Sequence, residues 1–131
     1  GHEQAGIAPL EEMSLRLKLP SKWFQAAHFG IVNHGRFHRV HEMREVKIVD
    51  MLDGAKRSPL GIEGLAQLGM ADARGRDGLH ETHTNYEPFI RWGELISTVK
   101  GKKELEGRAA WDDKRKRQAS LIKQDKGASQ C

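Results

Sequence analysis

The chain has 131 residues, enough for one domain, and its 37% hydrophobic content with few aromatic residues allows only a small core. Lys and Arg total 22 against 18 Asp and Glu, and the resulting net charge of +4 is compatible with a phosphate-bearing partner. A single cysteine, Cys131, excludes a disulfide within one chain, and no apolar run approaches about 18 residues, so we expect no insertion into a membrane.

Residues 1–45 show no sustained hydrophobic period, so we expect them to form a largely irregular N-terminal extension. Three leucines alternate with two cations over residues 15–19, a spacing compatible with a short strand that stops at Pro20. Trp23 and Phe24 lie in a stretch rich in His, Gly and Asn. These rings either join the core of the chain or pack on a neighbouring molecule.

Residues 46–103 carry the pattern of a small α+β core. Residues 44–52 alternate and are rich in β-branched side chains, which predicts a first strand. After a basic turn, Ser58 can cap a helix with Pro59 at its first position, and Gly69 can end that helix because glycine adopts positive φ. Residues 79–84 predict a second strand, a second helix follows from about Glu87 or Pro88, and residues 99–103 predict a third strand. The expected order is therefore βαβαβ.

Residues 104–131 are helix-prone, highly charged and poor in core candidates. We expect a charged helix that lies in solvent or along RNA and ends in a frayed tail. The chain then divides into an N-terminal extension (1–45), the α+β core (46–103) and a charged C-terminal helix and tail (104–131).

Many of the basic residues lie in predicted turns, at helix starts or in the C-terminal run, where a cation can reach phosphate oxygens. Four consecutive cations over residues 114–117 repel one another, and an RNA backbone would relieve that repulsion. The alternative is a solvated surface, because Asp112 and Asp113 can pair with this run at helical spacing. The predicted RNA-binding residues are Lys56, Arg57, Arg74, Arg76, Arg91, Lys100, Lys102, Lys103, Lys114, Arg115, Lys116 and Arg117.

Two pairs of histidines have spacings that can place imidazoles on one helix face, His34 with His38 and His80 with His83. His34 adjoins Gly35 in an expected loop, and a separation of three residues in a strand turns two side chains to opposite faces. No cysteine lies near either pair, so we expect no metal site and no cofactor. The sequence also offers no nucleophile elbow, phosphate loop or paired carboxylates, so we expect no catalytic residues and no enzyme.

Four short motifs follow one another along residues 46–91: Val46-Lys47-Ile48, Lys56-Arg57, Leu68-Gly69-Met70 and Pro88-Phe89-Ile90-Arg91. Their order and spacing resemble the ribosomal large-subunit protein thirty family, whose members are small βαβαβ proteins that bind ribosomal RNA. The long segments on either side of this core look like those of a mitochondrial form. The resemblance implies a structural, non-catalytic constituent of the large ribosomal subunit in the mitochondrial matrix. Its partners would be ribosomal RNA and neighbouring ribosomal proteins, with no small-molecule substrate.

A competing resemblance is to the ribosomal small-subunit protein sixteen family. It is carried by Leu15-Arg16-Leu17, Ile62-Glu63, Asn85, Glu87 and Trp92. An interpretation from another class is an accessory subunit of a mitochondrial respiratory-chain membrane complex, whose basic tails would face protein. Salt-sensitive RNA binding would separate the ribosomal interpretations from this one. A small hydrolase is a more distant alternative, which would require a pocket with perturbed acids or histidines.

Overall fold

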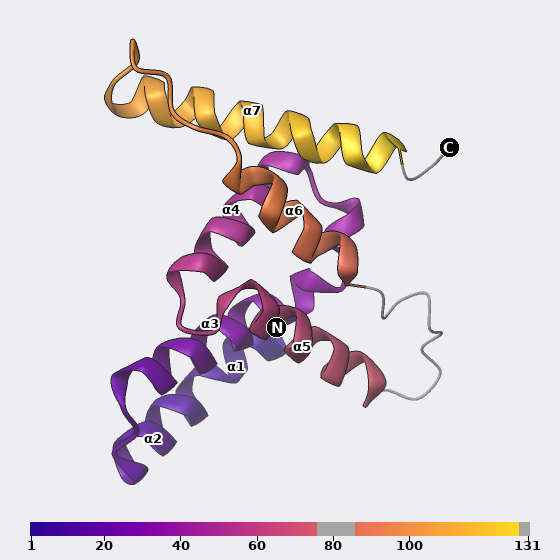
Figure 1. Cartoon of the computed structure of the whole chain (residues 1–131). Helices are drawn as coiled ribbons and strands as arrows, with labels where there is room; N and C mark the ends of the chain where they lie inside the picture. Colours follow the sequence, from indigo (N-terminus) through magenta and orange to yellow (C-terminus); the bar gives the residue numbers. More distant parts are fainter. Residues whose placement is uncertain (76–85, 129–131) are drawn as a thin grey trace.

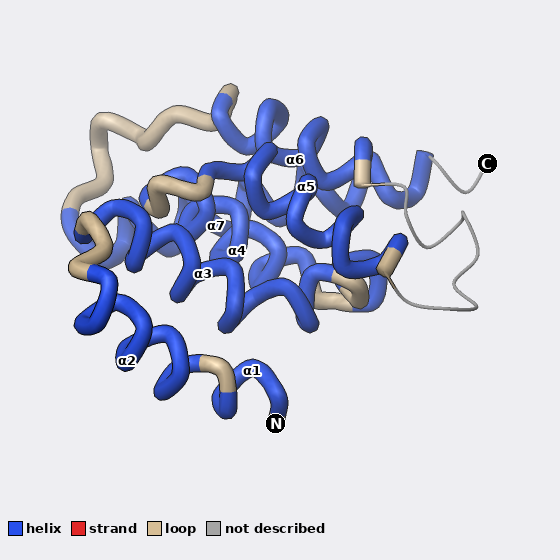
Figure 2. The backbone as a smooth tube through the Cα atoms, turned by 90° about the horizontal axis from the view of Figure 1, so that it is seen from below, coloured by secondary structure: helices blue, strands red, loops and turns tan. Residues whose placement is uncertain are grey.

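The computed structural model describes residues 1–75 and 86–128, and the regular structure of this part of the chain is entirely helical (Figures 1 and 2). The expected α+β class with a βαβαβ core is therefore wrong, because no strand occurs among the described residues. The second predicted strand, residues 79–84, lies outside those residues. The helices are α1 (His2–Ala5), α2 (Ile7–Leu17), α3 (Ser21–Phe37), the 3-10 helix η1 (Val40–Glu42), α4 (Glu45–Arg57), α5 (Gly61–Arg74), α6 (Glu87–Ser97) and α7 (Gly107–Ala128).

The segment expected as the first strand is helix α4, and its pattern of burial gives the reason. Ile48, Val49, Leu52 and Ala55 are all fully buried. They have the i, i+1, i+4, i+7 spacing of one helix face. Within residues 44–52 alone, strand alternation and helical periodicity share several positions, so the short window could not separate the two. In a strand, Ile48 and Leu52 would lie on one face and Val49 and Ala55 on the other, whereas on a helix all four share one face.

The first expected helix is α5, but both of its ends differ from the prediction. It begins at Gly61 rather than at Pro59, and Ser58 Oγ accepts a hydrogen bond from the N–H of Leu60 (3.2 Å) in the turn before it. It continues through Gly69 to Arg74, so Gly69 does not end it. A Cβ at Gly69 would overlap the ring of Phe37, so this glycine instead permits the close approach of α3 and α5.

The helix expected from Glu87 or Pro88 is confirmed as α6, whereas residues 99–103 form no strand. The C-terminal helix is confirmed as α7, which lies across α4 and α6 at one side of the molecule (Figure 1). One face of α7 is buried there through Gln118, Ala119 and Ile122. None of the described helices is long and apolar enough to cross a membrane.

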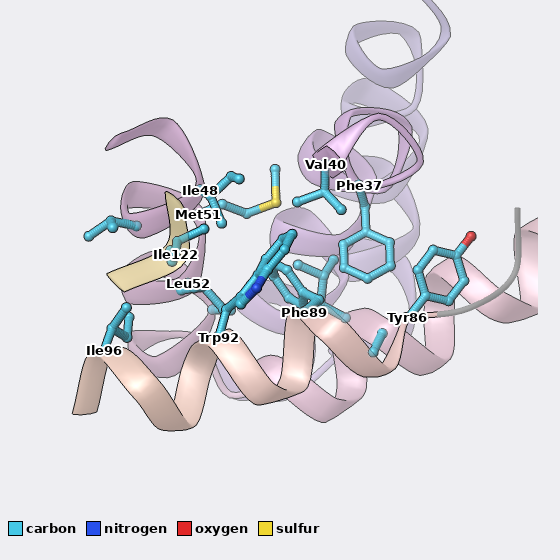
Figure 3. Packing of buried hydrophobic residues seen from close by; sticks show 14 of the residues in the cluster. Phe37, Val40, Ile48, Met51, Leu52, Tyr86, Phe89, Trp92, Ile96 and Ile122 are labelled. Atoms are coloured by element: carbon cyan, nitrogen blue, oxygen red, sulfur yellow. The ribbon is translucent and has the colours of Figure 1, made fainter. Parts of the chain in front are cut away.

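The core lies between α3, α4, α5, α6 and α7, and its largest fully buried side chains are Trp92, Phe37 and Phe89 (Figure 3). Phe37 meets Phe89 edge to face, with 4.6 Å between ring centroids. Phe37 and Val40 belong to the segment that was expected to be irregular, so that expectation is wrong. At the side opposite α7, α1 and α2 pack on α3 (Figure 1). The division of the chain at residues 45 and 103 stays a prediction.

Candidate functional site

Two of the predicted RNA-binding arginines make contacts between helices. Arg91 of α6 donates to both carboxylate oxygens of Asp125 of α7, at 3.2 and 2.8 Å. Arg115 of α7 makes the same two-point contact with Asp50 of α4, at 2.7 and 2.5 Å. Paired in this way, both guanidinium groups hold α7 on the core, and fewer of their N–H groups remain for phosphate.

The other predicted RNA-binding cations either make contacts within the chain or are exposed to solvent. Arg117 donates to Asp113 (2.8 Å) and to the carbonyl of Lys100 (2.7 Å), Lys102 lies 3.6 Å from Asp113, and Lys56 donates to the Ser97 hydroxyl. Arg76 lies outside the described residues. Exposed members of the set are Arg57, Arg74, Lys100, Lys103, Lys114 and Lys116. The role of the set in RNA binding stays a prediction.

A small hollow of about 500 Å³ between α4 and α7 brings two predicted residues together, Lys56 and Arg57, beside Trp111. Asp50 and Asp53 line the same hollow, so acidic and basic charge are nearly balanced in it. Because these charges nearly cancel, we expect the hollow to bind phosphate only weakly.

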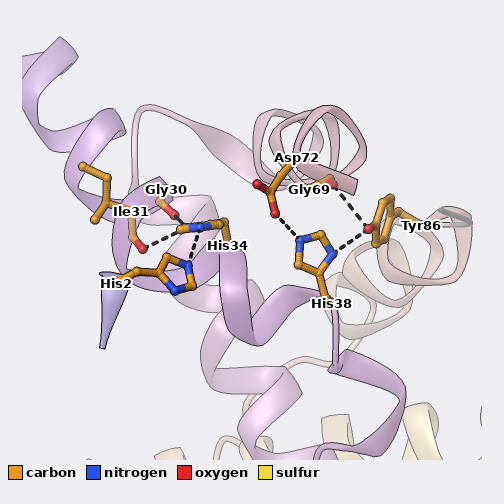
Figure 4. A network of polar contacts seen from close by, with 8 residues as sticks. All are labelled: His2, Gly30, Ile31, His34, His38, Gly69, Asp72 and Tyr86. Carbon is orange, nitrogen blue, oxygen red and sulfur yellow. Dashed lines mark hydrogen bonds and ion pairs between the residues drawn. The ribbon is translucent and has the colours of Figure 1, made fainter. Parts of the chain in front are cut away.

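His38, at the C-terminus of α3, joins three helices through a partly buried polar network (Figure 4). Its Nε2 lies 2.7 Å from the Asp72 carboxylate of α5, and its Nδ1 lies 2.8 Å from the hydroxyl of Tyr86, the residue before α6. The Tyr86 hydroxyl also lies 3.3 Å from the Gly69 carbonyl. A phenol carries one proton, so Tyr86 can donate it either to the Gly69 carbonyl or to Nδ1 of His38, and the tautomer of His38 sets which of its nitrogens donates. An imidazole oriented by a carboxylate is the arrangement of a general base, but in this conformation both of its nitrogens are occupied.

His34 lies one turn before His38 on α3, so the spacing noticed in the sequence does place both imidazoles on one helix face. Its Nδ1 faces the carbonyls of Gly30 (3.1 Å) and Ile31 (3.0 Å), and its Nε2 lies 3.3 Å from Nε2 of His2 (Figure 4). Within residues 1–75 and 86–128, no group of three or more His, Cys, Asp and Glu side chains is arranged to hold a metal ion. His80 and His83 lie outside these residues.

Asp125 accepts a further hydrogen bond from the indole N–H of Trp92, at 2.7 Å. The hydrogen bond from Arg91 is the main cause that lowers the pKa of Asp125 below its ordinary value, and the Trp92 bond adds to it while burial opposes both. The same pairing raises the pKa of Arg91. Asp125 is therefore held as a carboxylate, in contact with a fully buried aromatic side chain.

A second and more basic cavity was missed by the sequence reasoning. The basic pocket, of about 640 Å³, opens between the end of α3 and the start of α4. Its cations were overlooked because they fall in the segment expected to be irregular and in the supposed strand. The helical spacing of Phe29, Asn33 and Arg36 was the signal that could have found it. The lining residues are Phe29, Asn33, Arg36, Arg39, Glu42, Met43, Arg44, Lys47, Asp50 and Met51.

One wall of the basic pocket is held by the far end of the chain. Lys126, in the last turn of α7, donates to the carbonyl of Met43 (3.0 Å) and lies 3.4 Å from the Glu45 carboxylate. Its ammonium group also lies 5.7 Å from the ring centroid of Trp92, within the range of a cation–π contact. The segment between α3 and α4 is thus fixed from outside by α7.

Comparison with known proteins finds relatives that bear the name Multifunctional CCA protein. It is 34% identical over 94 residues to the Multifunctional CCA protein of Mannheimia succiniciproducens, covering 70% of this chain and 22% of the relative. It is 38% identical over 101 residues to the Multifunctional CCA protein of Chromobacterium violaceum, covering 76% and 25%. For the one from Xanthomonas campestris the identity is 40% over 83 residues, covering 61% and 20%. The chain therefore spans about a quarter or less of the length of these relatives. No family model matches it, and no solved structure matches it.

These relatives overturn the ribosomal interpretation. They are not ribosomal proteins of either subunit, and neither the small-subunit alternative nor the respiratory accessory subunit is supported. They come from bacteria, which contradicts the expected mitochondrial matrix location. They also bear the name of an enzyme family, which contradicts the expectation of a non-catalytic protein. The motifs that suggested ribosomal protein thirty lie on α4, α5 and α6, so the strand pattern on which that resemblance rested does not exist there.

Proposed function

We propose that this chain is the helical part of a CCA-adding, tRNA nucleotidyltransferase-related protein and that it contributes binding of tRNA. The observation that carries the proposal is the 38% identity over 101 residues to a Multifunctional CCA protein. Proteins of that family act on tRNA with nucleotide substrates, so the expected ribosomal partners and the expected lack of a small-molecule substrate are both contradicted. Transfer of nucleotides is proposed for the complete protein, of which this chain matches a quarter or less.

The electrostatics of the chain support a contact with RNA rather than a catalytic role for this part. The net charge is +4, and the basic pocket carries four cations against two acids. The one carboxylate-oriented imidazole, among the described residues of α3 and α5, has both nitrogens bonded to protein groups. Cations of this kind supply the sequence-independent part of affinity for a nucleic acid.

The test is a binding titration with the 131-residue chain. Fluorescently labelled tRNA is titrated with the protein at several salt concentrations, and an equal length of double-stranded DNA serves as the control nucleic acid. We expect tighter binding to tRNA than to the duplex, with an affinity that falls as salt rises. Equal binding to both, or none at low salt, would contradict the proposal.

A further inference from the structure

We propose that the basic pocket binds one unpaired nucleotide of RNA, with its phosphate on Arg36, Arg44 and Lys47 and its base against Phe29 and Met43. The proposal rests on the proposed function, because the tRNA partner supplies the RNA.

The distribution of charge around the pocket favours a phosphate group. Both acidic residues that line it are paired, Glu42 with Arg39 at 3.2 Å and Asp50 with Arg115 of α7 at 2.7 and 2.5 Å. Arg36, Arg44 and Lys47, in contrast, make no ion pair with any side chain in the described parts of the chain, and all three are exposed. Like charges gathered on one cavity repel each other, and a phosphate group removes that repulsion.

The apolar wall beside these cations can hold a base. Phe29 and Met43 are half-buried, and Met51 lies behind them as part of the core. The Phe29 ring rests against α4 at Gly54, where a Cβ would come within 3.0 Å of its Cε2 atom. An aromatic ring and a thioether held next to guanidinium groups form a surface on which a base can stack.

The N-terminus of α4 also favours an anion in the pocket. Arg44 is the residue before α4, so the N-terminus of this 13-residue helix opens at the pocket. The partial positive charge at a helix N-terminus adds to that of the side chains and favours an anion there.

An unpaired nucleotide fits this arrangement better than a duplex does. In a double helix the bases are stacked and paired inside, so only backbone phosphates would reach the cations and the apolar wall would stay empty. A single-stranded segment can present a phosphate and a base together. The pocket is also distinct from the His38 network, because Phe29, Asn33 and Arg36 lie on one face of α3 while His34 and His38 lie on the opposite one.

The decisive experiment compares two double variants that remove equal charge from the 131-residue chain. Arg36→Ala with Arg44→Ala changes the pocket, and Arg108→Ala with Lys123→Ala changes two exposed cations of α7 that do not belong to the predicted RNA-binding set. The probe is a labelled single-stranded RNA of about ten nucleotides, with the same strand annealed to its complement as the duplex control. We expect the pocket variant to raise the Kd for the single strand at least about tenfold and the α7 variant to raise it much less. The slope of log affinity against log salt should fall by about 0.7 in the pocket variant, because the contact with one phosphate is lost.

A charge-neutral variant separates stacking from electrostatics. Phe29→Leu keeps an apolar side chain against Gly54 but removes the aromatic face, so it should weaken single-stranded RNA and leave duplex binding unchanged. Photocrosslinking with 4-thiouridine in the same RNA should label peptides from residues 29–51. Far-ultraviolet circular dichroism confirms that each variant keeps the helical content of the parent chain.

The possible results separate this inference from the proposed function. If tRNA binds but the two double variants weaken it equally, or the crosslinks lie only outside residues 29–51, the pocket assignment is overturned while tRNA binding stands. If poly-glutamate displaces the RNA and the single strand has no advantage over the duplex, the pocket is a general anion site and the nucleotide assignment is overturned. If no RNA binds at all, both proposals fail together.

Discussion

Gly69 illustrates how a single position sets the distance between two helices. Its hydrogen atom faces the fully buried ring of Phe37, and any larger side chain would occupy the space of that ring. The sequence alone predicts that Gly69 ends a helix, because glycine is common at helix ends. Gly69 instead lies inside α5, where it allows α3 to pack closely. The favourable contact with Phe37 offsets the destabilisation that a glycine causes within a helix.

Gly69→Ala should destabilise the fold by about 1–3 kcal/mol, because the added Cβ would overlap the fully buried ring of Phe37 and force it to shift. The measurement is the free energy of unfolding from urea titration followed by circular dichroism. Gly101→Ala is the matched control, since a Cβ at that position meets nothing within 4 Å. Equal effects of the two substitutions would show that the close approach of α3 and α5 is not tight.

At the scale of elements, α7 is the helix whose role differs most from its sequence. Its charges suggest a helix lying in solvent or on RNA, yet three of its charged side chains bond to other helices. They are Arg115, which bonds to Asp50 of α4, Asp125, which bonds to Arg91 of α6, and Lys126, which bonds to Glu45 of α4. The buried Gln118 donates to the carbonyl of Ile96 at 3.0 Å, so it bonds to the end of α6, where this carbonyl also accepts from the N–H of Val99 at 3.3 Å. Charged residues in α7 therefore position it as much as its apolar residues do.

Asp125→Asn should destabilise the chain by about 1–3 kcal/mol, because it removes the negative partner of Arg91 and weakens the bond from the Trp92 indole. The fluorescence of Trp92 during urea unfolding provides the measurement, although two other tryptophans contribute background. Asp112→Asn is the control, since its pair with Arg108 is highly exposed and 3.9 Å long, and it should cost less than about 0.5 kcal/mol. A smaller loss for Asp125→Asn than for this control would contradict the assigned role.

The same carboxylate makes stability depend on pH. Because the pKa of Asp125 is lower in the folded chain than its ordinary value of 3.8, the unfolded chain takes up this proton first as the pH falls. The stabilisation is complete above 3.8 and is lost as the pH drops below that value through the folded pKa. Urea midpoints measured between about pH 5 and pH 2.5 should fall with acid, and less steeply in Asp125→Asn. Parallel curves would rule out this carboxylate as a source of the acid sensitivity.

How far the sequence could predict these elements depended on the length of the pattern. The C-terminal helix and the start of α6 near Pro88 were predictable, because a long charged run and a proline at a helix start are strong signals. The helix over residues 45–57 was not, because β-branched side chains over a short window fit a strand equally well. The basic pocket could not be anticipated, since it forms only when Arg36 of α3 and Lys47 of α4 are brought together by tertiary packing.

At the scale of the whole molecule, one continuous core links segments from most of the chain. Phe37 comes from α3, Leu52 from α4, Trp92 from α6 and Ile122 from α7 (Figure 3). A chain with separately folding parts would show separate cores, whereas these side chains form a single cluster. We therefore expect residues 29–75 and 86–128 to unfold together.

Ile122→Ala tests this expectation, because Ile122 is fully buried and belongs to the helix that the sequence predicts to lie in solvent or along RNA. The loss should be about 2–4 kcal/mol, and helix content and tryptophan fluorescence should report the same transition. Leu15→Ala is the control, since Leu15 is 82% exposed and its change should lie within about 0.5 kcal/mol. Two separate transitions in the parent chain would show that α7 folds independently.

The hydrogen bond from Lys126 to the Met43 carbonyl connects the last described turn of the chain with the segment that carries Arg39 and Arg44. A restraint between two segments acts in both directions, so a ligand that immobilises the pocket would also immobilise the end of α7. RNA would then slow amide hydrogen exchange in residues 122–126, some eighty positions along the sequence from where it binds. Conversely, Lys126→Met would loosen the pocket and lower its affinity without removing any group that touches the ligand. The last turn of α7 therefore supports RNA binding from a distance, by holding the pocket segment in place without touching the RNA.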